Sequence, residues 1–218
     1  MKRVYISADI EGMEGVVSSL QISRGQSDFN LGRKRLAEDV NAAIQACLDF
    51  GVEEIVVCDA HADMENIIIE DLNPEAKLIS GAMRSSLQME CIQEGFDAVI
   101  IFGHAGAGLT FNGVLDHTYN GSKIYNVRMN GTLMNTEAVL NAVIAGHYNI
   151  PLVAVIGDEA LAEEVKAFVP EVEAVVVKRG LSRRAALSIH PKKARELIYA
   201  GVKRALENAA KVAPLKLS

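Results

Sequence analysis

The chain lacks three features that would each point to a different class of protein. Basic residues are not in excess: 22 lysines and arginines face 28 aspartates and glutamates, the formal net charge is −6, and the positive residues are dispersed. Nucleic-acid binding needs a continuous positive surface, so no nucleic acid is expected as a partner. Hydrophobic runs such as 97–103 and 150–157 fall far short of the roughly 20 residues of a membrane span. The amino terminus has no signal-peptide apolar region, so no membrane partner is expected either.

Cysteine is also scarce. Cys47, Cys58 and Cys91 show no CxxC spacing, and any disulfide scheme leaves one of them unpaired. This usage fits a reducing compartment, and a cytoplasmic location is therefore expected. Each cysteine is interpreted as a small hydrophobic core residue rather than as a nucleophile or metal ligand.

Hydrophobic residues are abundant and make up 50% of the 218 residues. That content is enough for one domain with a large core. Short β-prone runs alternate with longer amphipathic stretches, which predicts an α/β fold: a mainly parallel sheet flanked by helices in three layers. The runs are apolar throughout rather than alternating, so both faces of the sheet are expected to be buried.

The predicted elements follow from these runs and from helical spacing of apolar residues. Strands are expected at 3–9, 53–59, 76–80, 97–103, 124–131, 150–158 and 172–180. Helices are expected at 32–50, 85–96, 135–149, 159–170 and 191–212. Residues 105–132 are irregular and rich in glycine, asparagine and threonine, and they are long enough to form a functional loop.

Acidic and histidine side chains fall where successive hydrophobic runs end. Asp9 and Glu11 follow the first run, His61 follows the second, and His104 follows the run that ends in VIIFG. Taken singly, each is more simply an exposed turn residue. The loops at the carboxyl ends of parallel strands converge, however, and two neighbouring acids repel unless a cation lies between them. Carboxylates and imidazoles together therefore predict a divalent-metal site at the carboxyl ends of the strands.

Three further residues have more than one interpretation. Glu137 lies in the first turn of an expected helix, where an acid complements the helix dipole, and on the sequence alone that role is narrowly favoured. His117, beside Asp116 in the irregular loop, suits a neutral imidazole acting as base or nucleophile, and an exposed loop histidine is an equally good account. Asp59 is a candidate to orient the imidazole of His61 or to cap the next segment.

Seven motifs occur in order along nearly the whole chain: SADIEG, CDAHADMEN, LISG, FGHAGAG, GVLDH, NTEAVLNAVIAGHYNIPLVAVIGD and VVVKRGLSRRAA. Together they resemble the D-aminopeptidase DppA family, peptidase family M55, whose signature is SxDxEG. The resemblance assigns metal binding to five residues: Asp9, Glu11, His61, His104 and Glu137. It implies that Asp9 bridges two zinc ions, and that His117 is the catalytic histidine. On this ground Glu137 becomes a ligand rather than a partner of the helix dipole.

The activity implied by the resemblance is that of a zinc-dependent aminopeptidase. Short D-amino-acid-containing peptides are the implied substrates, hydrolysed by dinuclear metal-assisted amide hydrolysis. Two alternatives stay open: another dinuclear metal hydrolase acting on amides or phosphoesters, and a noncatalytic metal-binding assembly protein. The resemblance also implies a homo-oligomer, specifically a decamer. Residues 1–218 are expected to form a single domain, with the family's smaller carboxy-terminal segment absent or truncated.

Overall fold

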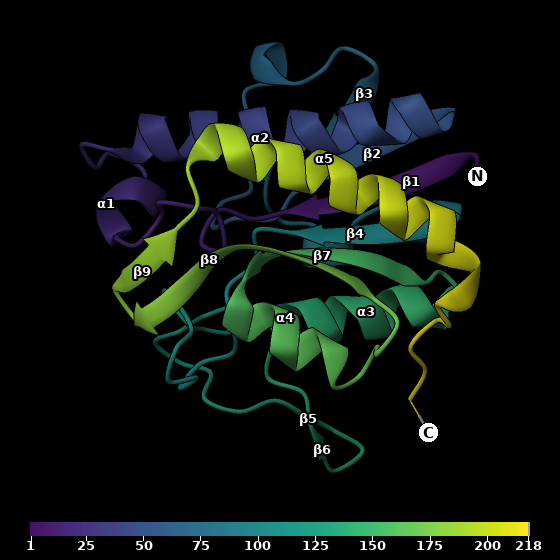
Figure 1. Cartoon of the computed structure of the whole chain (residues 1–218). Helices are drawn as coiled ribbons and strands as arrows, with labels where there is room; N and C mark the ends of the chain where they lie inside the picture. Colours follow the sequence, from purple (N-terminus) through teal and green to yellow (C-terminus); the bar gives the residue numbers. More distant parts are fainter. Residues whose placement is uncertain (218) are drawn as a thin grey trace.

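The hydrophobic runs pair into one seven-stranded sheet in a computed structural model that describes residues 1–217 (Figure 1). The strand order is β3-β2-β1-β4-β7-β8-β9, and every pairing is parallel except that of β8 with β9. The strands are β1 (Arg3–Ala8), β2 (Glu54–Asp59), β3 (Ala76–Ile79), β4 (Ala98–Phe102), β7 (Leu152–Asp158), β8 (Glu173–Ser182) and β9 (Ala185–Ser188). The predicted α/β class with a mainly parallel sheet is confirmed.

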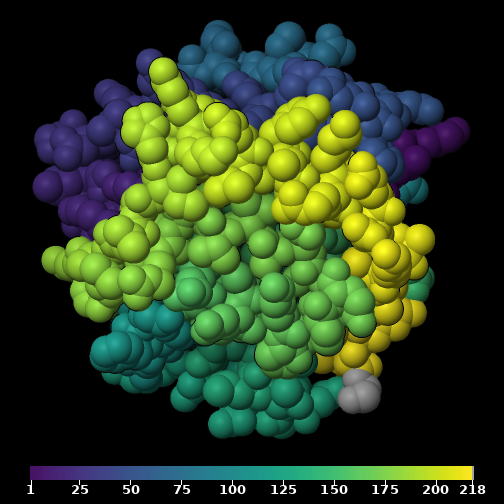
Figure 2. Space-filling view, viewed as in Figure 1, coloured from purple at the N-terminus to yellow at the C-terminus, as the bar shows by residue number. Residues whose placement is uncertain are grey.

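Helices cover both faces of this sheet. Helices α2 (Phe29–Phe50) and α5 (Pro191–Asn208) lie on one face, and α3 (Glu137–His147) and α4 (Glu159–Lys166) lie on the other (Figure 1). Successive residues of β1 enter different cores, with Val4 and Ile6 on the α2 side and Tyr5 on the α3 side. This double burial explains why the strands are apolar at every position. In the space-filling view α5, in yellow-green to yellow, runs across the face shown, next to the purple and blue atoms of the first part of the chain (Figure 2).

Short elements complete the chain. They are α1 (Ser19–Ile22), the hairpin of β5 (Arg128–Met129) and β6 (Thr132–Leu133), and the 3₁₀ turns η1 (Ile69–Asp71), η2 (Leu87–Met89), η3 (Ile92–Glu94) and η4 (Ala209–Lys211). The strand expected at 124–131 is reduced to β5, and an Asn-Gly turn at 130–131 joins it to β6, with φ of 50° and 82° at the two residues. Within residues 1–217, no helix combines the length and the apolar character that crossing a membrane requires.

The helix expected at 85–96 was wrong. The segment forms two 3₁₀ turns instead, and Leu87 and Cys91 have positive φ values of 47° and 66°. Side chains of β1 take the carbonyls that a helix would use: Ser7 Oγ donates to the Gln88 carbonyl at 3.0 Å, and Tyr5 Oη donates to a carbonyl two residues later at 2.8 Å. Tertiary hydrogen bonds therefore override the helical spacing of this segment.

The strand order identifies the edge of the sheet at which a ligand is expected to bind. From β1 the chain adds β2 and β3 on one side and then β4, β7 and β8 on the other. Ligands bind in such sheets outside the carboxyl ends of the strands, where the strand order reverses. Adjacent strands lie about 4.8 Å apart, so side chains leaving β2, β1 and β4 meet within about 10 Å of one another.

Candidate metal centre

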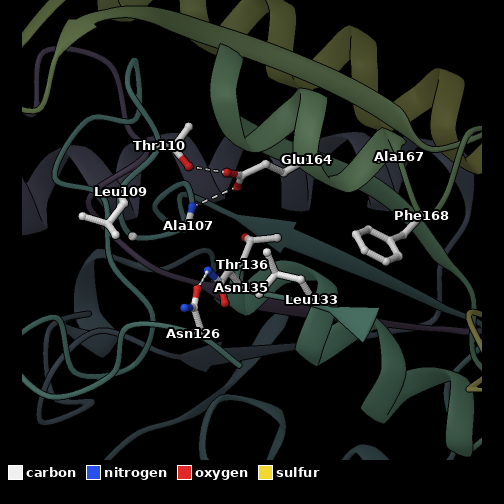
Figure 3. Close-up of a pocket in the computed structure, with 11 residues that line it drawn as sticks. Ala107, Leu109, Thr110, Asn126, Leu133, Asn135, Thr136, Glu164, Ala167 and Phe168 are labelled. Atoms are coloured by element: carbon white, nitrogen blue, oxygen red, sulfur yellow. Dashed lines mark hydrogen bonds between the residues drawn. The ribbon is translucent and has the colours of Figure 1, made fainter. Parts of the chain in front are cut away.

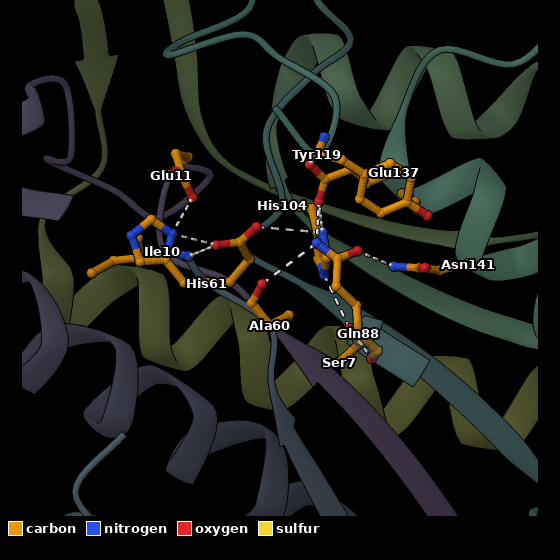
Figure 4. Close-up of polar contacts among 12 residues, drawn as sticks. Ser7, Ile10, Glu11, Ala60, His61, Gln88, His104, Tyr119, Glu137 and Asn141 are labelled. Atoms are coloured by element: carbon orange, nitrogen blue, oxygen red, sulfur yellow. Dashed lines mark hydrogen bonds and ion pairs between the residues drawn. The ribbon is translucent and has the colours of Figure 1, made fainter. Parts of the chain in front are cut away.

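The five predicted ligands gather at this reversal point, and all of them are buried (Figure 4). They form two groups of three: Asp9, Glu11 and His61, and Asp9, His104 and Glu137. Within each group the ligand atoms lie within 4.8 Å of one another. Asp9 belongs to both groups because it leaves β1, the strand between β2, which leads to His61, and β4, which leads to His104.

Asp9 directs one carboxylate oxygen to each group. Its Oδ1 lies 2.9 Å from His61 Nδ1, and its Oδ2 lies 3.5 Å from His104 Nδ1. Glu11 Oε2 approaches His61 Nδ1 to 3.1 Å, and Glu137 Oε2 approaches His104 Nδ1 to 3.0 Å. The arrangement therefore has the form of two metal sites that share one carboxylate.

The outer nitrogen of each histidine fixes which nitrogen faces the carboxylates and could bind a metal. His61 Nε2 lies 2.7 Å from the carbonyl oxygen of Ile22, an acceptor only, so Nε2 carries the proton. His104 Nε2 lies 3.1 Å from Ser7 Oγ, whose own hydrogen goes to the Gln88 carbonyl, so this Nε2 also donates. Nδ1 of each ring therefore faces the carboxylates, where it donates a hydrogen bond without a metal and is the nitrogen that would bind one. Hydrogen bonding of the second ring nitrogen in this way is typical of metal-ligating histidines.

Asp59 does not orient the His61 imidazole, contrary to one of the two expectations for it. Its Oδ2 accepts hydrogen bonds from the main-chain N–H groups of Asn66 and Ile67, the latter at 2.7 Å. Its Oδ1 accepts from the main-chain N–H of His61 at 3.3 Å. The carboxylate therefore shapes the loop that carries His61, and the Ile22 carbonyl holds the ring.

Two glycines allow the loops that carry Asp9 and His104 to touch. The Gly12 N–H donates to the Gly103 carbonyl at 2.6 Å. A Cβ on Gly103, whose φ is +70°, would lie 2.1 Å from the Asp9 carbonyl oxygen, and a Cβ on Gly12 would lie 2.5 Å from the His104 carbonyl oxygen. A side chain at either position would push the two loops apart.

The electrostatics of the group favour a bound cation. Asp9, Glu11 and Glu137 are at most 2% exposed, and among residues 1–217 no lysine or arginine forms an ion pair with any of them. Burial, and then the charge of Glu11, raise the pKa of Asp9 to about 7. The buried Lys178 donates from Nζ to the carbonyl oxygens of Glu11 and Val16 instead. Three buried carboxylates with two imidazoles fit divalent metal ions.

His117 faces the space between the two groups. Its Nδ1 lies 2.9 Å from the Leu115 carbonyl oxygen and therefore carries a proton, which leaves Nε2 as the nitrogen that takes up or releases one. Nε2 lies 4.0 Å from Glu11 Oε1 and 3.7 Å from Glu137 Oε1. Burial alone would lower the pKa of His117, but these carboxylates raise it above its ordinary value. His117 also lines a cavity of about 320 Å³ with Asp9, Glu11 and Glu137.

Supporting side chains were missed at the sequence level. Gln88 donates from Nε2 to Glu137 Oε2, and its Oε1 accepts from Asn141 Nδ2 at 2.8 Å (Figure 4). The Tyr119 N–H donates to Glu137 Oε1 at 2.6 Å. Gln88 lies in a segment whose spacing predicts a helix, and nothing in its local sequence marks it as a partner of a carboxylate 49 residues away.

A larger cavity of about 430 Å³ lies beside the irregular loop, and none of the five predicted ligands lines it (Figure 3). Its lining is mainly apolar and includes Leu133 and Phe168. The carboxylate of Glu164 within it accepts hydrogen bonds from Thr110 Oγ1 at 2.6 Å and from the Ala107 N–H at 2.9 Å. Glu164 therefore anchors the loop that follows His104 and has no metal-binding geometry.

A second pair of buried acids lies between α2 and the loop after β1. The carboxyl groups of Glu14 and Asp39 are fully buried, with Arg35 Nε 3.8 Å from Glu14 and Arg195 Nη1 3.4 Å from Asp39. Burial, followed by the proximity of Glu14, raises the pKa of Asp39 to about 9. Asp39 therefore keeps a proton at neutral pH.

Comparisons with known proteins agree with this geometry. The peptidase M55 family model, described as D-aminopeptidase, matches residues 1–218. A D-aminopeptidase of Bacillus subtilis (strain 168) is 33% identical over 216 residues, which span 98% of this chain and 77% of that protein. A solved structure described as the zinc-dependent D-aminopeptidase DppA from Bacillus subtilis, a self-compartmentalizing protease, superposes with a TM-score of 0.96 at 30% identity, covering 99% of this chain and 78% of the other. The chain therefore belongs to the M55 family of D-aminopeptidases, which are metal-dependent hydrolases.

Proposed function

We propose that this protein is an aminopeptidase that binds two zinc ions per subunit and hydrolyses short peptides containing D-amino acids. The observation that carries the proposal is the position of Asp9, which directs one oxygen to each of two buried ligand groups. The descriptions of the two Bacillus subtilis proteins support zinc and the D-peptide substrate. We further propose that residues 1–218 form one catalytic domain, since the described strands share a single main sheet.

The residues divide into those that hold metal and one that moves a proton. Glu11 and His61 complete one site, and His104 and Glu137 complete the other. Zinc, when bound, supplies Lewis acidity, which polarises the scissile carbonyl and acidifies water. His117, held through Nδ1 by a carbonyl, has its free Nε2 facing both sites and serves as the proton-transfer group.

The role of His117 is tested by His117→Ala. We expect kcat to fall by about 10²- to 10⁴-fold while the zinc content stays at two ions per subunit, because general acid–base groups contribute that much and His117 holds no metal. His147→Ala, which removes an exposed histidine at the end of α3, is the matched control. An unchanged kcat in His117→Ala would show that His117 is a loop residue without a role in catalysis.

The substrate class is tested with purified, zinc-loaded protein. We expect hydrolysis of D-alanyl-D-alanine to exceed that of L-alanyl-L-alanine and of a phosphodiester such as bis(p-nitrophenyl) phosphate. Metal analysis should give two zinc ions per chain. Preferential phosphodiester cleavage would favour a dinuclear phosphoesterase, and bound zinc without any turnover would favour a noncatalytic assembly protein.

We also propose a homo-oligomer in the cytoplasm. The self-compartmentalizing description of the structural relative supports assembly, and exposed hydrophobic side chains of the irregular loop offer a surface for it, since Leu109 and Phe111 are 70% and 90% exposed. The three free cysteines support a reducing location. Light scattering at micromolar concentration should give the mass of a decamer, and a monomer at every concentration would contradict the assembly.

A further inference from the structure

The turn between β8 and β9 places two arginines beside the metal centre. Arg183 and Arg184 join the two strands, and Arg183 is tied to the segment that carries His117. Arg183 Nε lies 2.8 Å from Asp116 Oδ1, and the main-chain N–H of Leu115 donates to the Arg183 carbonyl at 2.8 Å. Figure 2 shows this light-green hairpin at the surface, directly against the teal loop.

A cavity of about 260 Å³ lies under this turn. Its lining includes Arg183 and Arg184 together with Glu11 and His117. The last two also line the 320 Å³ cavity of the metal centre, so the two cavities adjoin on either side of His117. Together the two cavities offer room for a peptide on both sides of His117.

The charge in the second cavity is arranged for an anion. Arg183 is compensated by Asp116, whereas Arg184 forms no ion pair with any residue in the described part of the chain. Glu11, the acid in the lining, directs Oε2 to His61 on the metal side. Arg184 is exposed at the edge of the cavity, so its guanidinium is available to a negative group that enters there. The planar guanidinium fork fits a carboxylate with two parallel hydrogen bonds.

We propose that this cavity binds the free C-terminal carboxylate of a short peptide substrate, with Arg184 as its ligand and Arg183, held by Asp116, as a neighbouring wall of the cavity. The proposal deepens the aminopeptidase function and rests on it. The metal centre holds the amino-terminal part of the substrate, and the arginines hold the opposite end. Only peptides short enough to reach from the metals to the hairpin satisfy both, so the site selects for short substrates with an unblocked carboxyl terminus.

The test compares D-alanyl-D-alanine with D-alanyl-D-alanine amide. We expect the wild-type protein to favour the free acid in kcat/KM by roughly 10- to 100-fold, the range given by a charge-assisted hydrogen bond. In Arg184→Met this acid-to-amide ratio should fall to about 3 or less. Arg179→Met is the matched control, because Arg179 is an exposed arginine of the same hairpin that lies outside the cavity lining, and it should keep the wild-type ratio. A wild-type ratio near one, or a ratio preserved in Arg184→Met, would overturn the proposal.

The same two compounds distinguish failure of the carboxylate site from failure of the aminopeptidase function. If the wild-type protein cleaves the peptide bond of D-alanyl-D-alanine amide, the aminopeptidase function is supported whatever the acid-to-amide ratio. If neither compound is hydrolysed, the function fails, and calorimetric binding of the same two compounds to the zinc-loaded protein decides the carboxylate site. Tighter binding of the acid that is lost in Arg184→Met supports the site, and equal binding of acid and amide refutes it. Matching thermal unfolding curves exclude misfolding of the variant.

Discussion

Asp9→Asn is expected to change stability in opposite directions without and with zinc. In the metal-free protein, burial and the neighbouring Glu11 raise the pKa of Asp9 from its ordinary 3.8 to about 7. Keeping Asp9 ionised in the folded state at pH 7 therefore costs about 4 kcal/mol. Asparagine has nearly the same volume and no charge, so the metal-free variant should be more stable than the wild type by up to that amount.

The pH dependence of this gain follows from the two pKa values. The unfolded chain releases the Asp9 proton near pH 4, whereas the folded chain retains it until about pH 7, so the wild type loses stability across that interval. The advantage of Asp9→Asn should therefore grow from near zero at pH 4 to its full size at pH 7. With zinc bound, the substitution should lower the stability of the folded protein instead of raising it. At a free concentration about 1,000 times Kd, each site contributes about 4 kcal/mol, and Asp9 supplies a ligand to both sites.

Thermal unfolding at pH 7, in a chelator and in excess zinc, measures both effects. For a chain of this size 1 kcal/mol shifts Tm by about 2–4 °C, so the metal-free variant should melt on the order of 10 °C above the wild type. In zinc the order should invert. Asp71→Asn, at an exposed aspartate, controls for the loss of one negative charge. A lower Tm for Asp9→Asn in chelator, or a zinc-induced shift as large as that of the wild type, would refute the shared-carboxylate reasoning.

Two other substitutions test the surroundings of the site. Gln88→Met should weaken zinc binding by roughly 10- to 100-fold, because Glu137 loses a hydrogen-bond donor and Asn141 loses its acceptor. Competition with a chromophoric chelator measures this affinity, and a wild-type value would show that Gln88 does not position the ligand. Asp39→Asn should flatten the dependence of stability on pH: the folded wild type keeps the Asp39 proton to about pH 9, while the unfolded chain releases it near pH 4. The free energy of unfolding of the wild type should therefore fall by up to about 1.4 kcal/mol per pH unit between those values. Urea unfolding at pH 6 and pH 8 measures this fall. An equal fall in the wild type and in Asp39→Asn would contradict the buried proton beside Glu14.

The meeting of the candidate ligand side chains at one edge of the sheet was predictable because three of them come where hydrophobic runs end. Asp9, His61 and His104 each follow such a run, and the geometry of parallel sheets brings the ends of neighbouring strands together. The sharing of Asp9 was not predictable from spacing, because it depends on β1 lying between β2 and β4, and chain order does not state spatial order. Glu137 was ambiguous for a different reason, since an acid in the first turn of a helix suits both the helix dipole and a metal.

Other features depend on contacts that leave little local trace. Gln88 lies in a segment with helical spacing, and hydrogen bonds from Tyr5 and Ser7 to its carbonyls unwind it. Lys178 follows the apolar run 174–177 of β8 and precedes the exposed Arg179, so nothing local distinguishes its charge from that of a surface residue. Its acceptors lie more than 160 residues earlier in the chain, so its role in holding the loop after Glu11 emerges only in the folded protein.

The contact between Gly12 and Gly103 limits where this enzyme can acquire new specificity. Each loop leaves no room for a Cβ in the other, and the main chains are hydrogen-bonded across the contact. An insertion or a larger residue in either loop would displace ligands of both metal groups at once. Altered substrate preference, whether by natural divergence or by laboratory evolution, should therefore arise in the 105–132 loop and in the hairpin at 183–184. Those segments border the substrate cavities, and they can change in length and side chain while the ligand-bearing loops stay fixed.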